Sequence, residues 1–353
     1  METAEETQMA SRIESTLDAL LSTPGIPSTE AAKRLSTVCT GYLAMFAQHY
    51  PGGPNTHENY GLSTPGLPTF LWRLWSGVFT RVLNSPIEEP VSYTYITPLI
   101  ELIGKLKDTP PSEGEQWIVM GETCCWRDLP LLGLECRENF NGPFPTVFTF
   151  RPYTRLLSQE GQLAISGASL FELQDLGSEN SESAGKYLAN CRRGWLSTQS
   201  FISRLWRDCD CNYSLYALWA MRTALEDWPE SLPSFDTQYD TLEESPAYLA
   251  LEVEAAAIWI FNTAPLMYQC TEIWGPNGNL DWPDNAGLPG IGGRRWKGVD
   301  GYDREHKRWE LWRDLFGEVI RWCDGAGKEH MQGWKVRDAA TRALETMKEV
   351  EQQ

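Results

Sequence analysis

Apolar residues recur at intervals of three and four through most of the chain, which is the pattern of amphipathic α-helices. We predict helices over 13–21, 28–46, 69–82, 97–106, 153–176, 198–206, 213–228, 304–323 and 336–347. At 117–120 a short strand is allowed by the pattern, but we prefer a helix. The chain is therefore predicted to be all-α: a multi-helix bundle around a single core, with long Gly/Pro/Trp loops and few or no strands.

One predicted helix, over 247–261, is apolar on nearly all sides, which marks it as central. It carries Glu252 and Glu254, and residues at helical spacing surround both carboxylates with apolar groups. A buried carboxylate is costly unless it is paired. At least one of the two should therefore meet an Arg, Lys or His, or else have a raised pKa suited to proton transfer. Both readings stay open.

A long loop precedes the helix at 304–323. Its sequence over 273–303 is IWGPNGNLDWPDNAGLPGIGGRRWKGVDGYD, and loops of this length usually act as lids or binding loops. Between residues 291 and 313, seven Lys or Arg face four Asp or Glu, which gives a locally positive segment. We expect its bases to pair with the buried acids of the 247–261 helix, or to hold an anionic ligand such as a carboxylate.

Composition narrows the class of protein. Lys and Arg number 30 against 48 Asp and Glu, and the net charge of −18 disfavours a nucleic-acid partner and adsorption to an anionic membrane. The first residues lack the pattern of a secretory signal, and no apolar run approaches the roughly 20 residues of a membrane span. Nine cysteines, an odd number, are then expected to be reduced, in the cytoplasm. One domain is predicted over 1–353, with a soft boundary in the acidic linker at 177–185.

Familiar catalytic signatures are absent. The sequence contains no G-x-S-x-G elbow, no H-E-x-x-H, no Walker loop and no strand followed by G-x-G-x-x-G. We therefore expect neither a cofactor nor a metal. The 16 tryptophans instead suggest an aromatic pocket for a small, largely apolar molecule.

The candidate site combines these features. Its predicted catalytic residues are Glu254 as an acid, base or orienting group, with His306 and Arg308 as polar anchors. Its predicted substrate-binding wall consists of aromatic side chains: Trp126, Trp259, Trp296, Tyr302 and Trp309. An ion pair between helices is the structural alternative for Glu254, and packing is the alternative for the aromatic residues.

Several short motifs carry a family resemblance. They are Trp296-Lys297-Gly298, Gly301-Tyr302, Arg308-Trp309, Trp312 and Phe316, preceded by Ala256-Ala257-x-Trp259-Ile260 and Trp126-Arg127-Asp128-Leu129-Pro130. With these the chain resembles a large fungal family, domain-of-unknown-function family 3632. The resemblance implies a soluble α-helical fungal protein, often encoded among secondary-metabolite genes, and it supplies no catalytic residue.

The function expected from these features is a cofactor-independent enzyme of fungal natural-product biosynthesis, of the cyclase, isomerase or pericyclase type. A non-enzymatic interaction or regulatory protein using the 273–303 loop is the first alternative. An enzyme that uses aminoacyl-tRNA to build a small peptide is the second, and the acidic balance disfavours it. The expected partner is a small-molecule substrate, and the sequence leaves the oligomeric state open.

Overall fold

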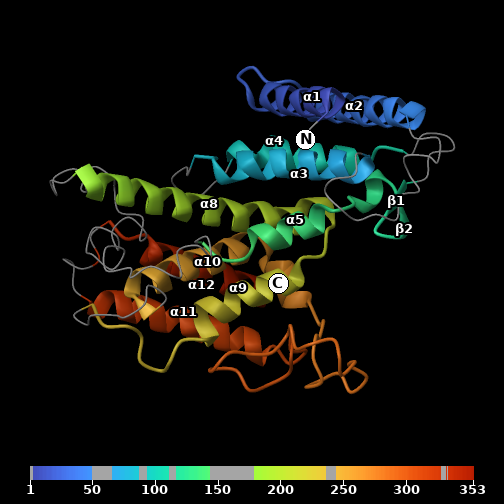
Figure 1. Cartoon of the computed structure of the whole chain (residues 1–353). Coiled ribbons are helices and arrows are strands. Elements are labelled where there is room, and N and C mark those ends of the chain that lie inside the picture. The colour runs from blue at the N-terminus through green and yellow to red at the C-terminus, as the bar shows by residue number, and fades with distance from the viewer. Residues whose placement is uncertain are drawn as a thin grey trace. The chain divides into compact units, whose positions relative to one another are not determined.

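A computed structural model describes residues 3–49, 66–86, 94–110, 117–143, 179–235, 244–326, 331 and 333–353. Within these ranges it contains ten α-helices and a single two-stranded hairpin (Figure 1). The prediction of an all-α protein is confirmed. The chain forms two compact units, Met1–Asn141 and Gly142–Gln353, each of which is described by itself. A single domain with a soft boundary at 177–185 stays a prediction.

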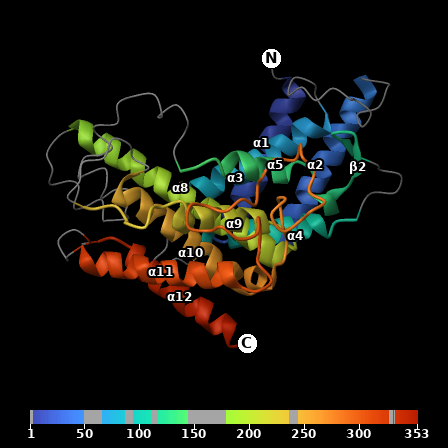
Figure 2. The ribbon, with the colours of Figure 1, turned by 90° about the horizontal axis from the view of Figure 1, so that it is seen from below.

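The first unit is a bundle of short helices. Helices α1 and α2 lie side by side, α1 also contacts α3, α2 contacts α4, and α3 contacts α5 (Figure 2). Their bounds are α1 (Ala4–Leu21), α2 (Ser28–His49), α3 (Leu67–Leu83), α4 (Thr97–Lys107) and α5 (Leu132–Asn139), with short turns η1 (Thr94–Ile96) and η2 (Trp126–Asp128). The predicted helices at 13–21, 28–46, 69–82 and 97–106 all fall within these elements. Because helical spacing put their apolar residues on one face, each could be recognised from sequence.

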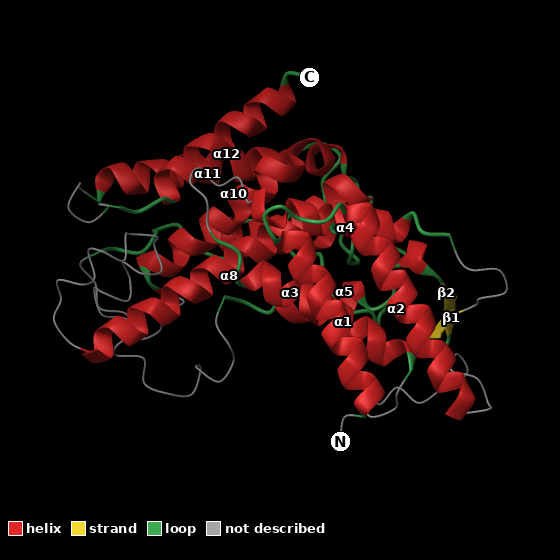
Figure 3. Ribbon diagram, turned by 90° about the horizontal axis from the view of Figure 1, so that it is seen from above, coloured by secondary structure: helices red, strands yellow, loops and turns green. Residues whose placement is uncertain are grey.

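The preference for a helix at 117–120 was wrong. Strands β1 (Trp117–Val119) and β2 (Glu122–Cys124) form an antiparallel hairpin, in which Trp117 pairs with Cys124 (Figure 3). Met120 and Gly121 connect them with φ angles of 53° and 80°. Two successive residues at positive φ make the tight turn whose twist matches that of the flanking strands.

The second unit is built around helix α10. Its elements are α8 (Glu179–Cys209), α9 (Ser214–Met221), the π-helical segment η5 (Arg222–Glu226), α10 (Pro246–Gln269), α11 (Lys307–Gly325) and α12 (Val336–Glu351). Helix α10 packs against α8, α9, η5 and α12, and α11 lies along α12 (Figure 2). Every residue from Leu249 to Ile260 is buried, so the central position predicted for the 247–261 helix is confirmed.

Burial also explains the composition of α10. Contrary to the expectation from sequence, its 24 residues are long and apolar enough to match a membrane span. Within the unit, 78 % of its most apolar window is buried. A helix covered on all sides by protein needs the same apolar composition as a helix surrounded by lipid.

Two further predictions fall wholly or partly outside the described residues. The helix predicted at 153–176 lies outside them. From Glu179 onward, the segment predicted to be an acidic linker belongs to α8. Glu, Ala and Lys favour helices intrinsically, so a polar composition there does not exclude one.

Two leucines in the second unit allow a matched test of its core. Leu315 on α11 is 3 % exposed and Leu280 in the long loop is 98 % exposed. We expect Leu315→Ala to lower the free energy of unfolding by about 2–5 kcal/mol, since it leaves a cavity. Leu280→Ala should stay within about 0.5 kcal/mol of the parent chain. Urea denaturation followed by tryptophan fluorescence measures both, and equal losses would contradict the placement of α11.

Candidate functional site

Glu226 is the most buried charged group near the long loop, with no exposed surface. It ends the π-helical segment η5, which continues directly from α9. A π-turn adds one residue to a helical turn and rotates the following side chains, and such segments are common at functional sites. Here it buries Ala224, Leu225 and Glu226 together.

Arg308 forms a two-fold ion pair with this carboxylate. Its Nε donates to Glu226 Oε1 at 2.8 Å and its Nη2 donates to Oε2 at 2.9 Å. The Trp312 indole donates to Oε1 at 2.6 Å, and the backbone N–H of Gly293 donates to Oε2 at 2.8 Å. The guanidinium also lies over the Trp296 and Trp312 rings, 5.5 and 5.7 Å from their centroids. Four donors therefore satisfy a carboxylate that has lost its water.

Hydrogen bonds to Glu226 hold the long loop against η5. The backbone N–H of Arg295 donates to Glu226 O at 2.9 Å, next to the bond from Gly293. A Cβ at Gly293 would lie 2.6 Å from Glu226 atoms. Gly293 therefore allows close approach between loop and helix, whereas Gly290 and Gly292 lie against Asp300 and Trp296 of the loop itself.

The loop also closes on itself. Ile273 and Gly301 form an antiparallel bridge, and Trp274 N donates to Asp300 O at 2.7 Å. Arg308 Nη1 donates to Gly301 O at 2.8 Å, so the same guanidinium that pairs with Glu226 holds the loop end. The segment 273–303 is thus an ordered loop with joined ends.

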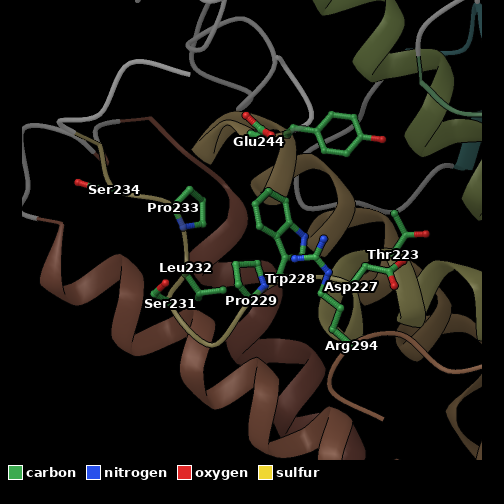
Figure 4. A pocket seen from close by; sticks show the side chains of 11 residues that line it. Thr223, Asp227, Trp228, Pro229, Ser231, Leu232, Pro233, Ser234, Glu244 and Arg294 are labelled. Atoms are coloured by element: carbon green, nitrogen blue, oxygen red, sulfur yellow. The ribbon is translucent and has the colours of Figure 1, made fainter. Parts of the chain in front are cut away.

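An open pocket of about 680 Å³ lies beside this junction (Figure 4). It is lined by residues of η5 and of the segment after it, by residues around the start of α10, and by one residue of the loop: Thr223, Asp227, Trp228, Pro229, Ser231, Leu232, Pro233, Ser234, Glu244, Tyr248 and Arg294. Its size suits a small molecule. Residues 228–246 show only the pattern of a polar loop, so the site was not predicted here.

Opposite charges meet at this pocket. Asp227 and Glu244 supply carboxylates and Arg294 supplies a guanidinium, which Figure 4 shows extending toward the Trp228 ring. Burial raises the pKa of Asp227 above its ordinary value, while nearby Arg222 and Arg294 oppose that shift. Arg222 Nε lies 4.0 Å from Asp227 Oδ2, at the outer limit of an ion pair. In the described ranges no three His, Cys, Asp or Glu gather as a possible metal site.

Glu252 lies one helical turn beyond Tyr248 on α10 and is 2 % exposed. Burial raises the pKa of its carboxyl to about 8, and hydrogen bonds from the side chains of Tyr248 and Trp195 act in the opposite direction. Tyr248 also lines the pocket. A carboxyl that is mostly protonated at neutral pH is thus linked to the pocket through one tyrosine.

Glu254 is paired with a cation, which is the other outcome predicted for the acids of this helix. It forms a buried ion pair with Arg192 of α8. The prediction that the positive segment pairs with the acids of α10 was wrong: Arg308 pairs with Glu226, Arg295 with Glu318 and Arg313 with Glu351. The reason is the π-turn, which turns Glu226 inward at a place where regular helical spacing gives no sign of it.

The other predicted site residues have their own contacts. Trp259 Nε1 donates to Gln199 at 2.6 Å, Tyr302 OH to Ser214 O at 2.9 Å, and Trp309 Nε1 to Glu351 at 3.0 Å. Trp296 Nε1 donates to Val299 O at 2.8 Å, and the His306 ring stacks on Tyr268 with centroids 4.1 Å apart. Trp126 belongs to the first unit, where it packs edge-on against Trp117. None of the eight predicted site residues, with Glu254 and Arg308 included, lines this pocket. Their catalytic or binding roles stay predictions.

Fold and site together define an all-α protein with an acid-containing pocket beside an ordered loop. Comparison with known families adds that a model described as "Protein of unknown function (DUF3632)" matches residues 75–316, and the chain belongs to this family. The predicted resemblance is confirmed. Neither the curated proteins nor the solved structures contain a match to the chain.

The buried pair predicts a large and asymmetric response to mutation. Arg308→Met should lower the free energy of unfolding by about 3–5 kcal/mol, because it leaves the Glu226 carboxylate buried without its cation. Arg308→Met with Glu226→Leu should recover much of that loss, since both charges are gone. The matched control is Arg337→Met, which breaks an exposed pair with Asp324 and should leave the melting temperature unchanged. Similar melting temperatures for all three variants would count against the pair as an anchor.

The raised pKa of Glu252 predicts a pH dependence of stability. The folded state holds this proton up to a pH of about 8, whereas the unfolded chain releases it near its ordinary pKa of about 4.3. Stability from this group therefore falls as the pH rises between these values, by up to about 1.4 kcal/mol per pH unit, and then levels off.

Glu252→Gln should remove that slope. Relative to the parent chain, the variant should gain stability steadily from pH 5 to pH 8 in urea denaturation. Glu254→Gln is the control on the same helix, because it weakens an ion pair with Arg192 and should give a loss that does not reverse with pH. Parallel stability curves for Glu252→Gln and the parent chain would refute the raised pKa.

Proposed function

We propose that this protein is an enzyme that moves protons on a small, largely apolar molecule held in the pocket at Trp228 and Tyr248. The reaction class is that of an isomerase or cyclase, in which the substrate keeps all its atoms. The observation that carries the proposal is the link between the pocket-lining Tyr248 and the buried Glu252, whose pKa is about 8. A group with a pKa near the working pH is suited to both giving and taking a proton.

The chemistry follows from the two states of Glu252. When protonated, its O–H donates to the Tyr248 oxygen, which leaves the Tyr248 proton available to the pocket. When ionised, the carboxylate accepts the Tyr248 proton instead. A proton can thus pass from Glu252 through Tyr248 to one substrate atom, and a proton from another substrate atom can return by the same route. No co-reactant is consumed.

Other pocket residues would bind the substrate. The Trp228 ring with Pro229, Leu232 and Pro233 offers an apolar wall, and Asp227, Glu244 and Arg294 offer polar contacts at its edge. The anchored loop keeps Arg294 in place, because backbone bonds from Gly293 and Arg295 to Glu226 flank it on both sides. Fixed geometry of this kind is what positioning requires.

The biological setting is part of the same proposal. A role in fungal natural-product biosynthesis rests on the motifs that the chain shares with its family. A cytoplasmic location is supported by the nine free cysteines. Docking of aminoacyl-tRNA is less well supported, because Arg295, Arg308 and Arg313 of the positive segment are engaged by acids of this chain.

The alternative function, an interaction protein that uses the long loop, has one specific observation in its favour. Three large apolar residues of the loop, Leu280, Leu288 and Ile291, are 98 %, 47 % and 45 % exposed. A partner protein could bury these side chains, and contiguous exposed apolar patches are typical of protein interaction sites. A chain that binds a partner but converts no metabolite would fit this alternative.

Isomerisation and cyclisation leave the mass of the substrate unchanged, and this makes a test possible without a known substrate. We would incubate the purified chain in D2O with a small-molecule extract of the source organism and search by mass spectrometry. The expected result is a product that differs from a precursor only in retention time and by incorporated deuterium. Glu252→Gln and Tyr248→Phe should each slow its formation at least about 100-fold, the scale of general acid–base catalysis.

The control for this experiment is Tyr268→Phe, a change on the same helix at a residue that does not line the pocket. It should keep the activity of the parent chain. Absence of any mass-neutral conversion, or a conversion that survives in Glu252→Gln, would refute the proposed acid–base pair.

A further inference from the structure

We infer that the ligand of this pocket is amphoteric: a small molecule that carries both a carboxylate and a protonated amine on an apolar body, as α-amino acids and their small derivatives do. The inference rests on the proposed function in one respect, since it names the substrate class for the same pocket. Its argument comes from charge placement and not from the Tyr248–Glu252 pair.

Arg294 and Asp227 bring opposite charges to one pocket without neutralising each other. The charge of Arg294 is near enough to lower the pKa of the Asp227 carboxyl, yet the two residues form no ion pair. Arg294 has no ion-pair partner in the described part of the chain, and the contact of Asp227 with Arg222 is 4.0 Å long. The pocket therefore keeps a site for an anion and a site for a cation.

The backbone positions of these two residues are both set by Glu226. Asp227 follows Glu226 directly in sequence. Arg294 stands between Gly293 and Arg295, whose backbone N–H groups donate to Glu226 Oε2 at 2.8 Å and to Glu226 O at 2.9 Å. These bonds fix the backbone of Arg294 beside that of Asp227, so the two side chains start from neighbouring, anchored positions at the pocket. Anchored positions of this kind lower the cost of ordering the two groups around a ligand.

A ligand with a single charge fits this arrangement less well. A simple anion at Arg294 would also face the carboxylates of Asp227 and Glu244, and a simple cation at Asp227 would face Arg294. An amphoteric molecule places each of its charges next to the opposite one. Burial disfavours the ionised Asp227, and a bound ammonium group would reverse that effect.

The remaining wall indicates what the rest of the ligand is made of. The pocket volume of about 680 Å³ exceeds what a charged head group alone would need, and Trp228, Pro229, Leu232 and Pro233 supply apolar surface. An indole ring binds flat apolar groups through its face. The apolar body of the ligand should therefore pack against Trp228.

Three indole compounds test the charge requirement with a constant body: L-tryptophan, which carries both charges, indole-3-propionate, which carries the negative one, and tryptamine, which carries the positive one. Calorimetric titration of the full chain should give an affinity for L-tryptophan at least tenfold higher than for either analogue. Equal affinities for the three compounds, or no binding of L-tryptophan at millimolar concentration, would overturn the inference.

Variants then assign each charge to its residue. Arg294→Gln should weaken L-tryptophan and indole-3-propionate at least tenfold and leave tryptamine unaffected. Asp227→Asn should weaken L-tryptophan and tryptamine and leave indole-3-propionate unaffected. The matched controls Arg304→Gln and Asp281→Asn, at exposed positions outside the pocket, should bind all three as the parent chain does. Losses that do not follow the charge of the ligand would overturn the assignment.

The same titrations with Glu252→Gln separate this inference from the proposed function. The charge preference should persist in that variant, because Glu252 is not among the residues that line the pocket. A preference for L-tryptophan without Glu252-dependent turnover would leave the substrate class standing and remove the acid–base proposal. Turnover that depends on Glu252, without a charge preference, would do the opposite.

Discussion

The buried ion pair between Arg308 and Glu226 is the constraint on which the second unit depends. Each partner loses its water on folding, a cost that only a complete set of hydrogen bonds can offset. The carboxylate meets that condition with bonds from Arg308, Trp312 and Gly293. The guanidinium meets it with Glu226 and the carbonyl oxygen of Gly301, and two indole rings lie close to it. One interaction thereby joins η5, the long loop and α11.

The position of this pair explains why the pocket lies where it does. Residues next in sequence to Glu226 and to its hydrogen-bond donor Gly293 line the pocket: Asp227 and Trp228 follow Glu226, and Arg294 follows Gly293. The ion pair is itself too well satisfied to bind a ligand, and its role is to fix the groups next to it. The residues of the ion pair give the site its rigidity, and the residues next to them remain able to bind a ligand. This is the arrangement expected where a rigid support positions a site.

The sequence predicted the helices better than the site. Apolar spacing identified most helices of both units, because those helices bury one face, and α10, because it buries all faces. For α8 it found only the last part of the helix. It failed at the β1–β2 hairpin, where Met120 takes a turn conformation that few large residues adopt. It failed again at Glu226, since the π-turn rotates this last residue of η5 off the face that regular helical spacing predicts. The pocket residues lie around that shift and in a polar loop, where periodicity carries no information.

The two acids of α10 show how far a sequence argument about burial can reach. It required that at least one of Glu252 and Glu254 be paired or have a raised pKa. In the structure Glu254 is paired with Arg192, and burial raises the pKa of Glu252. Which acid is paired and which has the raised pKa depends on α8. This helix presents Arg192 and Trp195 three residues apart on one face. A cation at residue 195 would have stabilised the ionised Glu252 and brought its pKa back toward the ordinary range. The indole at that position offers a hydrogen bond without a charge, so the acid that reaches the pocket through Tyr248 is also the acid that keeps its proton near neutral pH.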